Sequence, residues 1–555
     1  MSSRIAIAVP LKALLALAVV LALSVSGLMN SAFAASTTGV LDTSFNSGGA
    51  GFNDVVLAVA EQPDGKILVG GRFTTYNGSN AGRIIRLNSD GSVDPTFNTG
   101  AGFSAGKVND ILLLEDGSML VGLDSNPTYN NGTAVSRIAK ISSTGVLDTD
   151  FTSNLGTLNG QVISIIKLKD GGYAIGGQFS TINGTTCGGI AKIDASGNLD
   201  TSFANALGTG LARAGGGVAT VLTIGQLSSG AIVVGGKFDQ LSGTTIGNLA
   251  ALNVDGSPST SFNTNLGTGV TNGGDPTSGS VDTLAIQNGN KILIGGQVNS
   301  VNGTSIGALA RLNQDGTLDN TFNSGGTGIT GGSPLSITID TDEKIVIVHT
   351  GTLYNGSAAT HVMRTSADGV HDPTLDAPVS GAWYALPINN GGIYVFGAPT
   401  SYKGTSIGRL LRLAAPQRTL GPVSQTISGK VKEPVSSQTL TSNGFTGTLT
   451  YSISPGLPDG LNFDTETGQI TGTPNSPLEE TEFTITASDG SNTATATIIL
   501  TVADEDPVDE ESSGDTLPGT GSEYSLRLIG FAAALLALGL GAIYGNRAFA
   551  RRRLQ

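Results

Sequence analysis

Short apolar runs dominate the chain from about residue 40 to residue 413. Each run has roughly 4 to 8 residues and ends at an Asp-Gly or Asn-Gly pair, a pattern typical of β-hairpins. In the first stretch of this pattern we expect four strands, at residues 55–60, 67–73, 83–88 and 92–97. The fold class predicted by this pattern is all-β.

The pattern repeats seven times at intervals of roughly 50 to 60 residues, and three markers recur in every copy. One marker is Leu-Asp-x-x-Phe, the second resembles the Asp-Gly-Lys-Ile-Leu-Val-Gly-Gly of residues 64–71, and the third is the Asn-Gly pair at Asn77. The seven copies of the first marker end at Phe45, Phe97, Phe151, Phe203, Phe262, Phe322 and Leu375. Four-stranded antiparallel units of this length predict a seven-bladed β-propeller over residues 36–415. The repeat resembles the delta-60 repeat, a bacterial propeller family.

The order of the markers predicts how the ring closes. The first Leu-Asp-x-x-Phe, at residues 41–45, precedes any inner strand, whereas the last blade stops after its third strand at residues 409–413. We therefore expect the N-terminal segment to complete the last blade, which would leave no exposed terminal sheet edge.

A basic residue precedes the Asp of the first marker by eight positions in most copies. Arg86 and Asp94 lie equally far from Asp90, so they are expected to face each other across a hairpin. The same spacing occurs in Lys140 with Asp148, Lys192 with Asp200, Arg311 with Asp319 and Arg364 with Asp372. In the remaining copy both members change, to Ala251 and Ser259, as a partly buried ion pair predicts. The alternative is exposed charges that coincide by descent.

Arg412 has no Asp eight residues downstream, so we expect it to pair with Asp42. That pairing would be a second mark of ring closure.

A second domain is predicted over residues 417–502, where the chain becomes rich in Thr and Ser. Residues 456–464 and 468–474 resemble the putative Ig, cadherin-like family of bacterial surface proteins, which implies an Ig-like β-sandwich. Some members of that family bind Ca²⁺ between tandem domains. This chain has one copy, so Asp464, Glu466 and Asp489 are interpreted as turn residues, and no cofactor is expected.

Both ends of the chain carry targeting signals. Residues 1–34 have the basic start, apolar run and small residues of a signal peptide, with cleavage expected between Ala34 and Ala35.

Residues 503–516 form an acidic linker, and residues 517–555 begin with Leu517, Pro518, Gly519, Thr520 and Gly521. An apolar run at 526–544 and a basic tail follow, so this end resembles the LPxTG sorting signal of Gram-positive surface proteins. The resemblance implies that a sortase cleaves after Thr520 and joins the chain to cell-wall peptidoglycan. The alternative is an ordinary transmembrane anchor.

Composition excludes several classes of function. The formal net charge of −14 makes nucleic acid an unsuitable partner. Cys187 is the single cysteine, which rules out an intrachain disulfide and a thiolate zinc cage. We find no phosphate loop, catalytic triad or paired-carboxylate signature, so we expect no enzyme and no catalytic residue.

Three histidines, His349, His361 and His371, fall in the sixth repeat, but the sequence gives no reason for them to converge on a metal. Cys187 has no recognisable base nearby and is expected to be unreactive.

Three functions fit the sequence. The first is a wall-anchored protein whose propeller binds an extracellular glycan or protein on an Ig-like stalk. The others are an extracellular polysaccharide hydrolase or lyase and an inert surface spacer. The longest blade-to-blade loops, 204–217 and 263–280, predict the ligand-binding face, with Arg213, Asn272 and Asp275 as candidate contacts.

Overall fold

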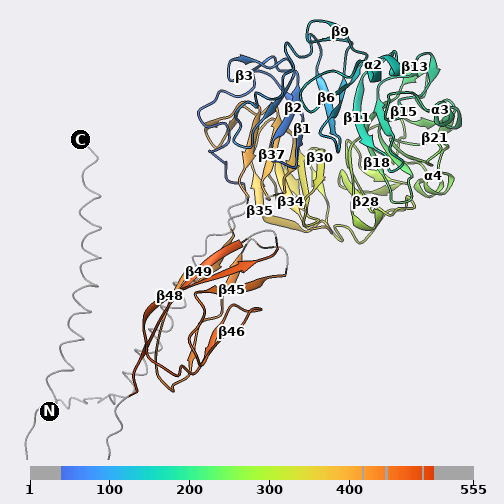
Figure 1. Cartoon of the computed structure of the whole chain (residues 1–555). Helices are drawn as coiled ribbons and strands as arrows, with labels where there is room; N and C mark the ends of the chain where they lie inside the picture. The colour runs from blue at the N-terminus through green and yellow to red at the C-terminus, as the bar shows by residue number, and fades with distance from the viewer. Residues whose placement is uncertain are drawn as a thin grey trace, which may run out of the picture.

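The computed structural model describes residues 39–505, except 390, 416–417, 444, 446–447 and 491–492. Seven antiparallel sheets follow one another in the first part of this range, and an Ig-like sandwich follows them (Figure 1). The described part of the chain is thus mostly β, as the sequence predicts. It contains no helix long and apolar enough to cross a membrane.

Each sheet, or blade, has an inner, a middle and a third strand, hydrogen-bonded in chain order. The inner strands are β1 (Val56–Glu61), β6 (Val108–Leu113), β11 (Val162–Lys167), β18 (Thr220–Gln226), β24 (Val281–Ile286), β30 (Pro334–Ile339) and β36 (Ala382–Pro387). The middle strands are β2 (Ile67–Gly71), β7 (Met119–Leu123), β12 (Tyr173–Gly177), β19 (Ile232–Lys237), β25 (Ile292–Gly296), β31 (Ile345–His349) and β37 (Ile393–Gly397). The third strands are β5 (Ile84–Leu87), β10 (Ile138–Ile141), β15 (Ile190–Ile193), β22 (Leu249–Leu252), β28 (Leu309–Leu312), β34 (Val362–Thr365) and β40 (Leu410–Leu413).

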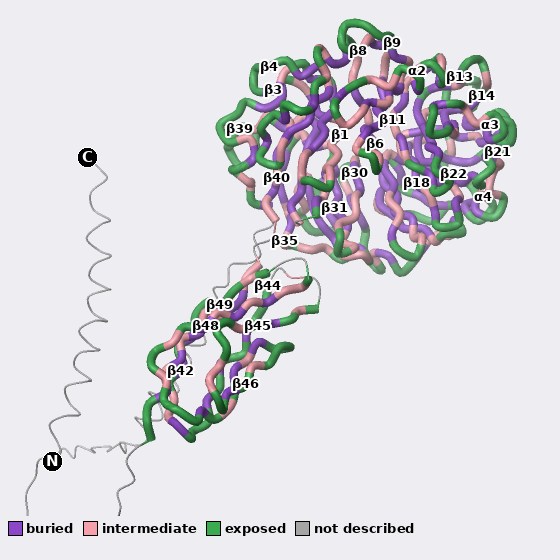
Figure 2. Tube along the Cα trace, in the orientation of Figure 1, coloured by how far each residue is buried: buried purple, intermediate pink, exposed green. Residues whose placement is uncertain are grey.

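The seven blades close into a propeller-like ring. Each inner strand contacts the inner strand of the next blade, and β36 contacts β1. Because every blade is covered on both faces by its neighbours, the middle strands are buried along their length, except for Lys237 at the end of β19, and apolar, except for Lys237 and for His349 in β31 (Figure 2). The core therefore lies between the blades.

The predicted fourth strand, residues 92–97 in the first blade, is wrong for most blades. Only the sixth blade has such a strand among the described residues, β35 (His371–Ala377), and elsewhere a single bridge such as Leu87 with Val93 replaces it. Beyond the bridge the chain turns, and in three blades it forms the helices α2 (Thr149–Leu155), α3 (Thr201–Leu207) and α4 (Thr260–Leu266).

The Asp of Leu-Asp-x-x-Phe explains this turn. Asp148 Oδ1 accepts a hydrogen bond from the Phe151 N–H at 2.9 Å and so caps the start of α2, and Asp200 caps α3 in the same way. A side chain that binds the backbone three residues ahead draws the chain out of the extended conformation.

A two-stranded hairpin connects the middle and third strands of each blade. These hairpins are β3 (Thr75–Tyr76) with β4 (Ser79–Asn80), β8 (Thr128–Tyr129) with β9 (Thr133–Ala134), β13 (Thr181–Ile182) with β14 (Thr185–Thr186), β20 (Gln240–Leu241) with β21 (Thr244–Thr245), β26 (Ser300–Val301) with β27 (Thr304–Ser305), β32 (Leu353–Tyr354) with β33 (Ser357–Ala358) and β38 (Ser401–Tyr402) with β39 (Thr405–Ser406). In the first, Asn77 and Gly78 have φ of 48° and 80°, as a tight type I′ turn requires.

The N-terminal segment closes the ring as predicted. Leu41 pairs with Leu413, the Asp42 N–H donates to the Arg412 carbonyl at 2.9 Å, and the Ala414 N–H donates to the Val40 carbonyl at 2.7 Å. The segment contributes a bridge to the last blade in place of a full strand.

The predicted ion pairs are confirmed in every blade that has both charges. The arginine pairs are short, with Nε to Oδ2 distances of 2.7 Å for Arg86–Asp94, 2.8 Å for Arg311–Asp319 and 2.9 Å for Arg364–Asp372. The lysine pairs, Lys140–Asp148 and Lys192–Asp200, are both 3.5 Å long and more exposed. The side chains of Arg311 and Asp319 are only 6% and 5% exposed, so the alternative of freely exposed charges is wrong for the arginine pairs.

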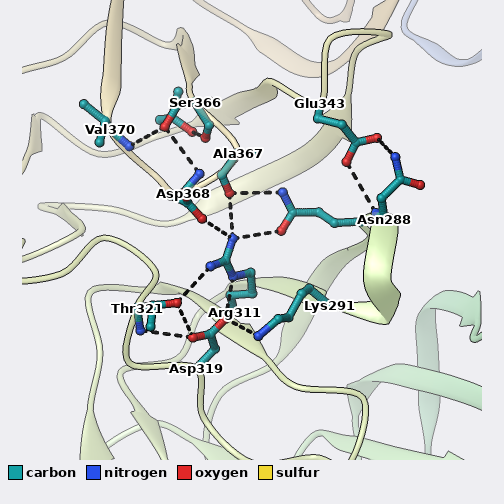
Figure 3. A network of polar contacts seen from close by, with 12 residues as sticks. Asn288, Lys291, Arg311, Asp319, Thr321, Glu343, Ser366, Ala367, Asp368 and Val370 are labelled. Atoms are coloured by element: carbon teal, nitrogen blue, oxygen red, sulfur yellow. Dashed lines mark hydrogen bonds and ion pairs between the residues drawn. The ribbon is translucent and has the colours of Figure 1, made fainter.

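Arginine also links adjacent blades. Figure 3 shows Arg311 bonded to Asp319 in its own blade and, through Nη1, to the carbonyl of Ala367 at 2.8 Å and to Asp368 at 2.9 Å in the next blade. Arg86 reaches the Ser143 carbonyl of its neighbouring blade in the same way, at 2.6 Å. A guanidinium can bind in two directions at once, which a lysine ammonium on a flexible stem does less well.

The second domain is a sandwich with its own core. Its strands are β41 (Thr419–Gly421), β42 (Ser424–Lys430), β43 (Val435–Ser436), β44 (Thr441–Asn443), β45 (Thr450–Ser454), β46 (Leu461–Phe463), β47 (Ile470–Gly472), β48 (Leu478–Ser488) and β49 (Thr493–Ala503). One sheet has the order β42-β49-β48-β45 and another the order β43-β47-β46. Asp464 accepts hydrogen bonds from the N–H groups of Glu466 and Thr467, which confirms it as a turn residue.

Candidate functional site: the axial channel

A bulge near the start of each inner strand shapes the centre of the ring. In all seven strands the register with the middle strand shifts at one residue, which is left without a pairing partner. The seven bulged residues are Leu57, Asn109, Ile163, Leu222, Asp282, Leu335 and Trp383. All of them line one cavity of about 830 Å³, which we call the axial channel. Bulges commonly re-aim side chains next to functional sites.

In the second, fourth and fifth blades the residue after the bulge joins its blade to the next one. Asp110 Oδ2 accepts the Ile165 N–H of the next inner strand at 2.7 Å, and Thr283 Oγ1 accepts the Ile337 N–H at 3.0 Å. These bonds satisfy backbone groups that an inner edge strand would otherwise leave unpaired. The channel wall is therefore held by side chains as well as by packing.

Two carboxylates give the channel its charge. Burial raises the pKa of Asp110 to about 6, although its two oxygens accept the N–H groups of Ile111 and Ile165. Burial also raises the pKa of Asp282, whose Oδ1 accepts the Ser280 hydroxyl at 2.6 Å. Of the described residues that line the channel, Lys107 alone is basic.

Two aromatic side chains face the same space from β36. Trp383 is half-buried and Tyr384 is 37% exposed, and the Tyr384 ring stacks on Phe396 with centroids 5.4 Å apart. Burial raises the pKa of the Tyr384 hydroxyl, and the negative charges of Asp110 and Asp282 raise it further. Tyr384 and the two carboxylates thus interact electrostatically, and Trp383 lines the same cavity.

The predicted contact residues lie elsewhere. Arg213 ends β16 (Leu211–Arg213), and its Nη2 donates to the Thr277 carbonyl at 3.4 Å, so the two long loops do meet. Asn272 and Asp275 are exposed, and Asp275 Oδ1 accepts the Thr277 N–H in a local turn. None of the three lines the axial channel.

The bulged residues lie near the start of each inner strand, whereas other lining residues, such as Thr338 and Leu386, lie near the ends of their strands. The channel residues themselves were not predicted from the sequence. Aligning the repeats on the bulge would have revealed them, because Asn109, Asp282 and Trp383 stand where the other copies have Leu or Ile.

The histidines and the cysteine add no recognisable site. His349 is buried, and neither of its ring nitrogens has a hydrogen-bond partner among the described residues. No group of three His, Cys, Asp or Glu in the described part of the chain is arranged to hold a metal. Cys187 is buried, and burial raises the pKa of its thiol to about 11, which disfavours the reactive thiolate.

The proposed processing sites lie outside the described residues. These are Ala34 and Ala35, the sorting motif Leu517 to Gly521, and the apolar run at 526–544.

Two family models match the chain. Residues 62–97, 168–203 and 287–322 match the family described as "Domain of unknown function (DUF5122) beta-propeller". Residues 413–503 match the family described as "Putative Ig domain". The chain therefore carries DUF5122 beta-propeller repeats followed by an Ig-like domain. No curated protein is significantly similar to it.

Solved structures show distant likenesses. A gluconolactonase from Xanthomonas campestris is 14% identical, with a TM-score of 0.27 and coverage of 54% of this chain and 83% of that chain. A protein of unknown function from Bacteroides thetaiotaomicron VPI-5482 is 10% identical, with a TM-score of 0.28 and coverage of 66% and 70%. A putative alpha-galactosidase/melibiase from Bacteroides fragilis NCTC 9343 is 20% identical, with a TM-score of 0.13, and the match spans 15% of this chain and only 16% of that chain. These likenesses are too distant to transfer an activity.

Proposed function

We propose that this is a cell-wall-anchored bacterial surface protein whose seven-bladed β-propeller binds an extracellular ligand in the axial channel. The Ig-like domain and the acidic linker would serve as its stalk. The observation that carries the binding role is the channel itself, a cavity of about 830 Å³ lined by all seven blades, with aromatic and charged side chains gathered on three of them. An inert spacer has no need of such a cavity.

Anchoring is proposed from the sequence of the two ends. A signal peptide at 1–34, the Leu-Pro-Gly-Thr-Gly motif and the apolar run with a basic tail occur in the order that sortase substrates require. The Thr520→Ala variant should still be secreted, because the signal peptide is intact. It should move from the wall fraction to the membrane fraction or the medium, and unchanged covalent attachment to peptidoglycan would contradict the anchoring role. A Ser522→Ala variant is the matched control.

Binding is favoured over catalysis by the engagement of Asp110. A pKa near 6 would suit a general acid. However, each of its oxygens accepts a backbone N–H group, which restrains the side chain against the movement that proton transfer needs but leaves each oxygen able to accept a further contact from a ligand. Saturable binding of a glycan or matrix protein, without turnover, is the expected result of a screen with the mature chain. Polysaccharide cleavage that Asp110→Asn abolishes would favour the hydrolase or lyase instead.

A further inference from the structure

The inner strands of the second, fifth and seventh blades place an unusual set of side chains on the channel wall. β6 contributes Asn109 and Asp110, β24 contributes Asp282, and β36 contributes Trp383 and Tyr384. The bulged positions of the other four blades carry Leu or Ile. Acidic and aromatic groups therefore face one cavity, whose other lining residues are mostly aliphatic, Ser and Thr side chains.

We propose that the axial channel binds an organic ammonium group, held against the faces of Trp383 and Tyr384 and paired with the carboxylates of Asp110 and Asp282. This inference rests on the proposed function, because it names the ligand class of the same channel. Tryptophan and tyrosine faces attract cations, most strongly where water is excluded. Two carboxylates against the single lining cation, Lys107, give the cavity a negative bias.

The surroundings of the two carboxylates favour the binding of a cation. Both Asp110 and Asp282 are held in surroundings that disfavour their ionised forms, and an ammonium group would offset that penalty. Outside the lining set, the positive charge of Lys237 lowers the pKa of Asp282, whereas the pKa of Asp110 reflects burial and its two backbone N–H partners. A neutral ligand would offset the penalty only through hydrogen bonds, without a charge contact.

Tryptophan fluorescence gives a direct readout, because Trp383 is the only tryptophan in the chain. The full-length protein in a neutral detergent is titrated with butylammonium, tetramethylammonium, butanol and butyrate, and each titration is repeated by calorimetry. We expect saturable changes with one or both ammonium ions and none with butanol or butyrate. The primary and quaternary probes distinguish an amine ligand from a choline-like one.

Variants locate the site. Asp282→Asn should weaken ammonium binding by about tenfold or more, the equivalent of one lost charge contact. Asp275→Asn is the matched control, since this exposed acid lies outside the channel, and it should bind as the wild type does. Loss of binding in Asp275→Asn alone would place the site on the loops and overturn the proposal.

The pH dependence supplies a further test. Affinity should rise between pH 5 and pH 7 as Asp110 ionises, and Asp110→Asn should flatten that rise. The charged or titratable groups that line the channel with it are Lys107, Asp282 and Tyr384. Burial raises the pKa of Asp282 as well, and the raised pKa of Tyr384 keeps its hydroxyl protonated over this range.

The outcomes separate this inference from the proposed function. A response to a neutral sugar but to no ammonium ion would overturn the ligand class and leave the channel as a binding site. No response of Trp383 and no heat with any probe would overturn the cation site. Anchoring through Thr520 is tested independently by fractionation.

Discussion

Arg412 and Asp42 form an ion pair with Nη2 and Oδ2 2.7 Å apart, although 370 residues separate them in the sequence. Nη1 of the same arginine donates to the Ser89 carbonyl of the first blade. One side chain thus joins the last blade, the N-terminal segment and the first blade. The ring is closed by the same arginine contacts that link its other blades.

The backbones of Gly51 and Gly408 are in close contact at this joint, so ring closure should also require glycine at position 408. A Cβ at Gly408 would lie 2.3 Å from the Gly51 Cα, a distance that backbone cannot accommodate without moving. We expect Gly408→Ala to lower the free energy of unfolding by about 2 kcal/mol and to expose the N-terminal segment to protease. Gly132→Ala is the control, because its nearest atom is 3.9 Å away and its φ is not positive. Equal protease resistance of the two variants would show that the joint can relax.

Removing one member of a buried ion pair should lower the free energy of unfolding far more than removing one member of an exposed ion pair. In the native protein, Asp319 Oδ2 lies 2.8 Å from Arg311 Nε and 2.7 Å from Lys291 Nζ. The Asp319→Ala variant leaves these two positive charges close together without the carboxylate that they share. We expect a loss of about 3 to 5 kcal/mol in urea unfolding. Asp200 is 28% exposed, so Asp200→Ala should cost clearly less.

The fourth blade shows how the protein does without these charges. At the places of Lys291, Arg311 and Asp319 it has Ala231, Ala251 and Ser259. The side-chain amide of Asn263 replaces the charges there: it donates to the Ala251 carbonyl and accepts the Ala251 N–H, both at 2.9 Å. The triple variant Lys291→Ala, Arg311→Ala, Asp319→Ser should therefore recover part of the loss seen in Asp319→Ala. A triple variant less stable than the single one would mean that the charges do not act as a unit.

Repetition made the ring, its closure and its ion pairs predictable from the sequence. Seven copies turn a weak local signal, such as Arg86 with Asp94, into a consistent spacing. The fourth strand was mispredicted because Asp148 can either continue a hairpin or cap a helix, and only the side-chain bond to Phe151 decides between them. The channel residues were missed because a bulge shifts register without changing the apolar pattern.

Ionisation of Asp110 should make the protein less stable at neutral pH. Its pKa of about 6 in the folded protein is above the ordinary value of 3.8, so the native state binds its proton more tightly than the unfolded state. The stability contributed by the protonated form is present at low pH and is lost as pH rises from about 4 through 6. Asp110→Asn should remove this loss, so its stability relative to wild type should improve by about 2 kcal/mol between pH 4 and pH 7. Parallel pH profiles in urea unfolding would contradict the shifted pKa.

His349 should produce the opposite dependence. It is 1% exposed at the end of β31, and burial, with help from the neighbouring His361, lowers its pKa from 6.5 to about 4. Because the folded protein disfavours the charged imidazole, the stability that depends on neutral His349 is present above about pH 6.5 and is lost as pH falls toward 4.

Leucine is the matched replacement for His349, since Leu123 occupies the same place in the second blade and is fully buried there. His349→Leu should abolish the pH dependence of this group, so the variant should gain on the order of 3 kcal/mol over wild type between pH 7 and pH 4. It should also lose little stability at pH 7, because leucine is apolar and the imidazole makes only weak contacts with the backbone of Gly351 and Thr360. Urea unfolding at pH 4, 5.5 and 7 measures the difference, with His371→Leu as a control at a less buried histidine. If His349→Leu and wild type lose the same stability on acidification, the buried imidazole is not the group that titrates.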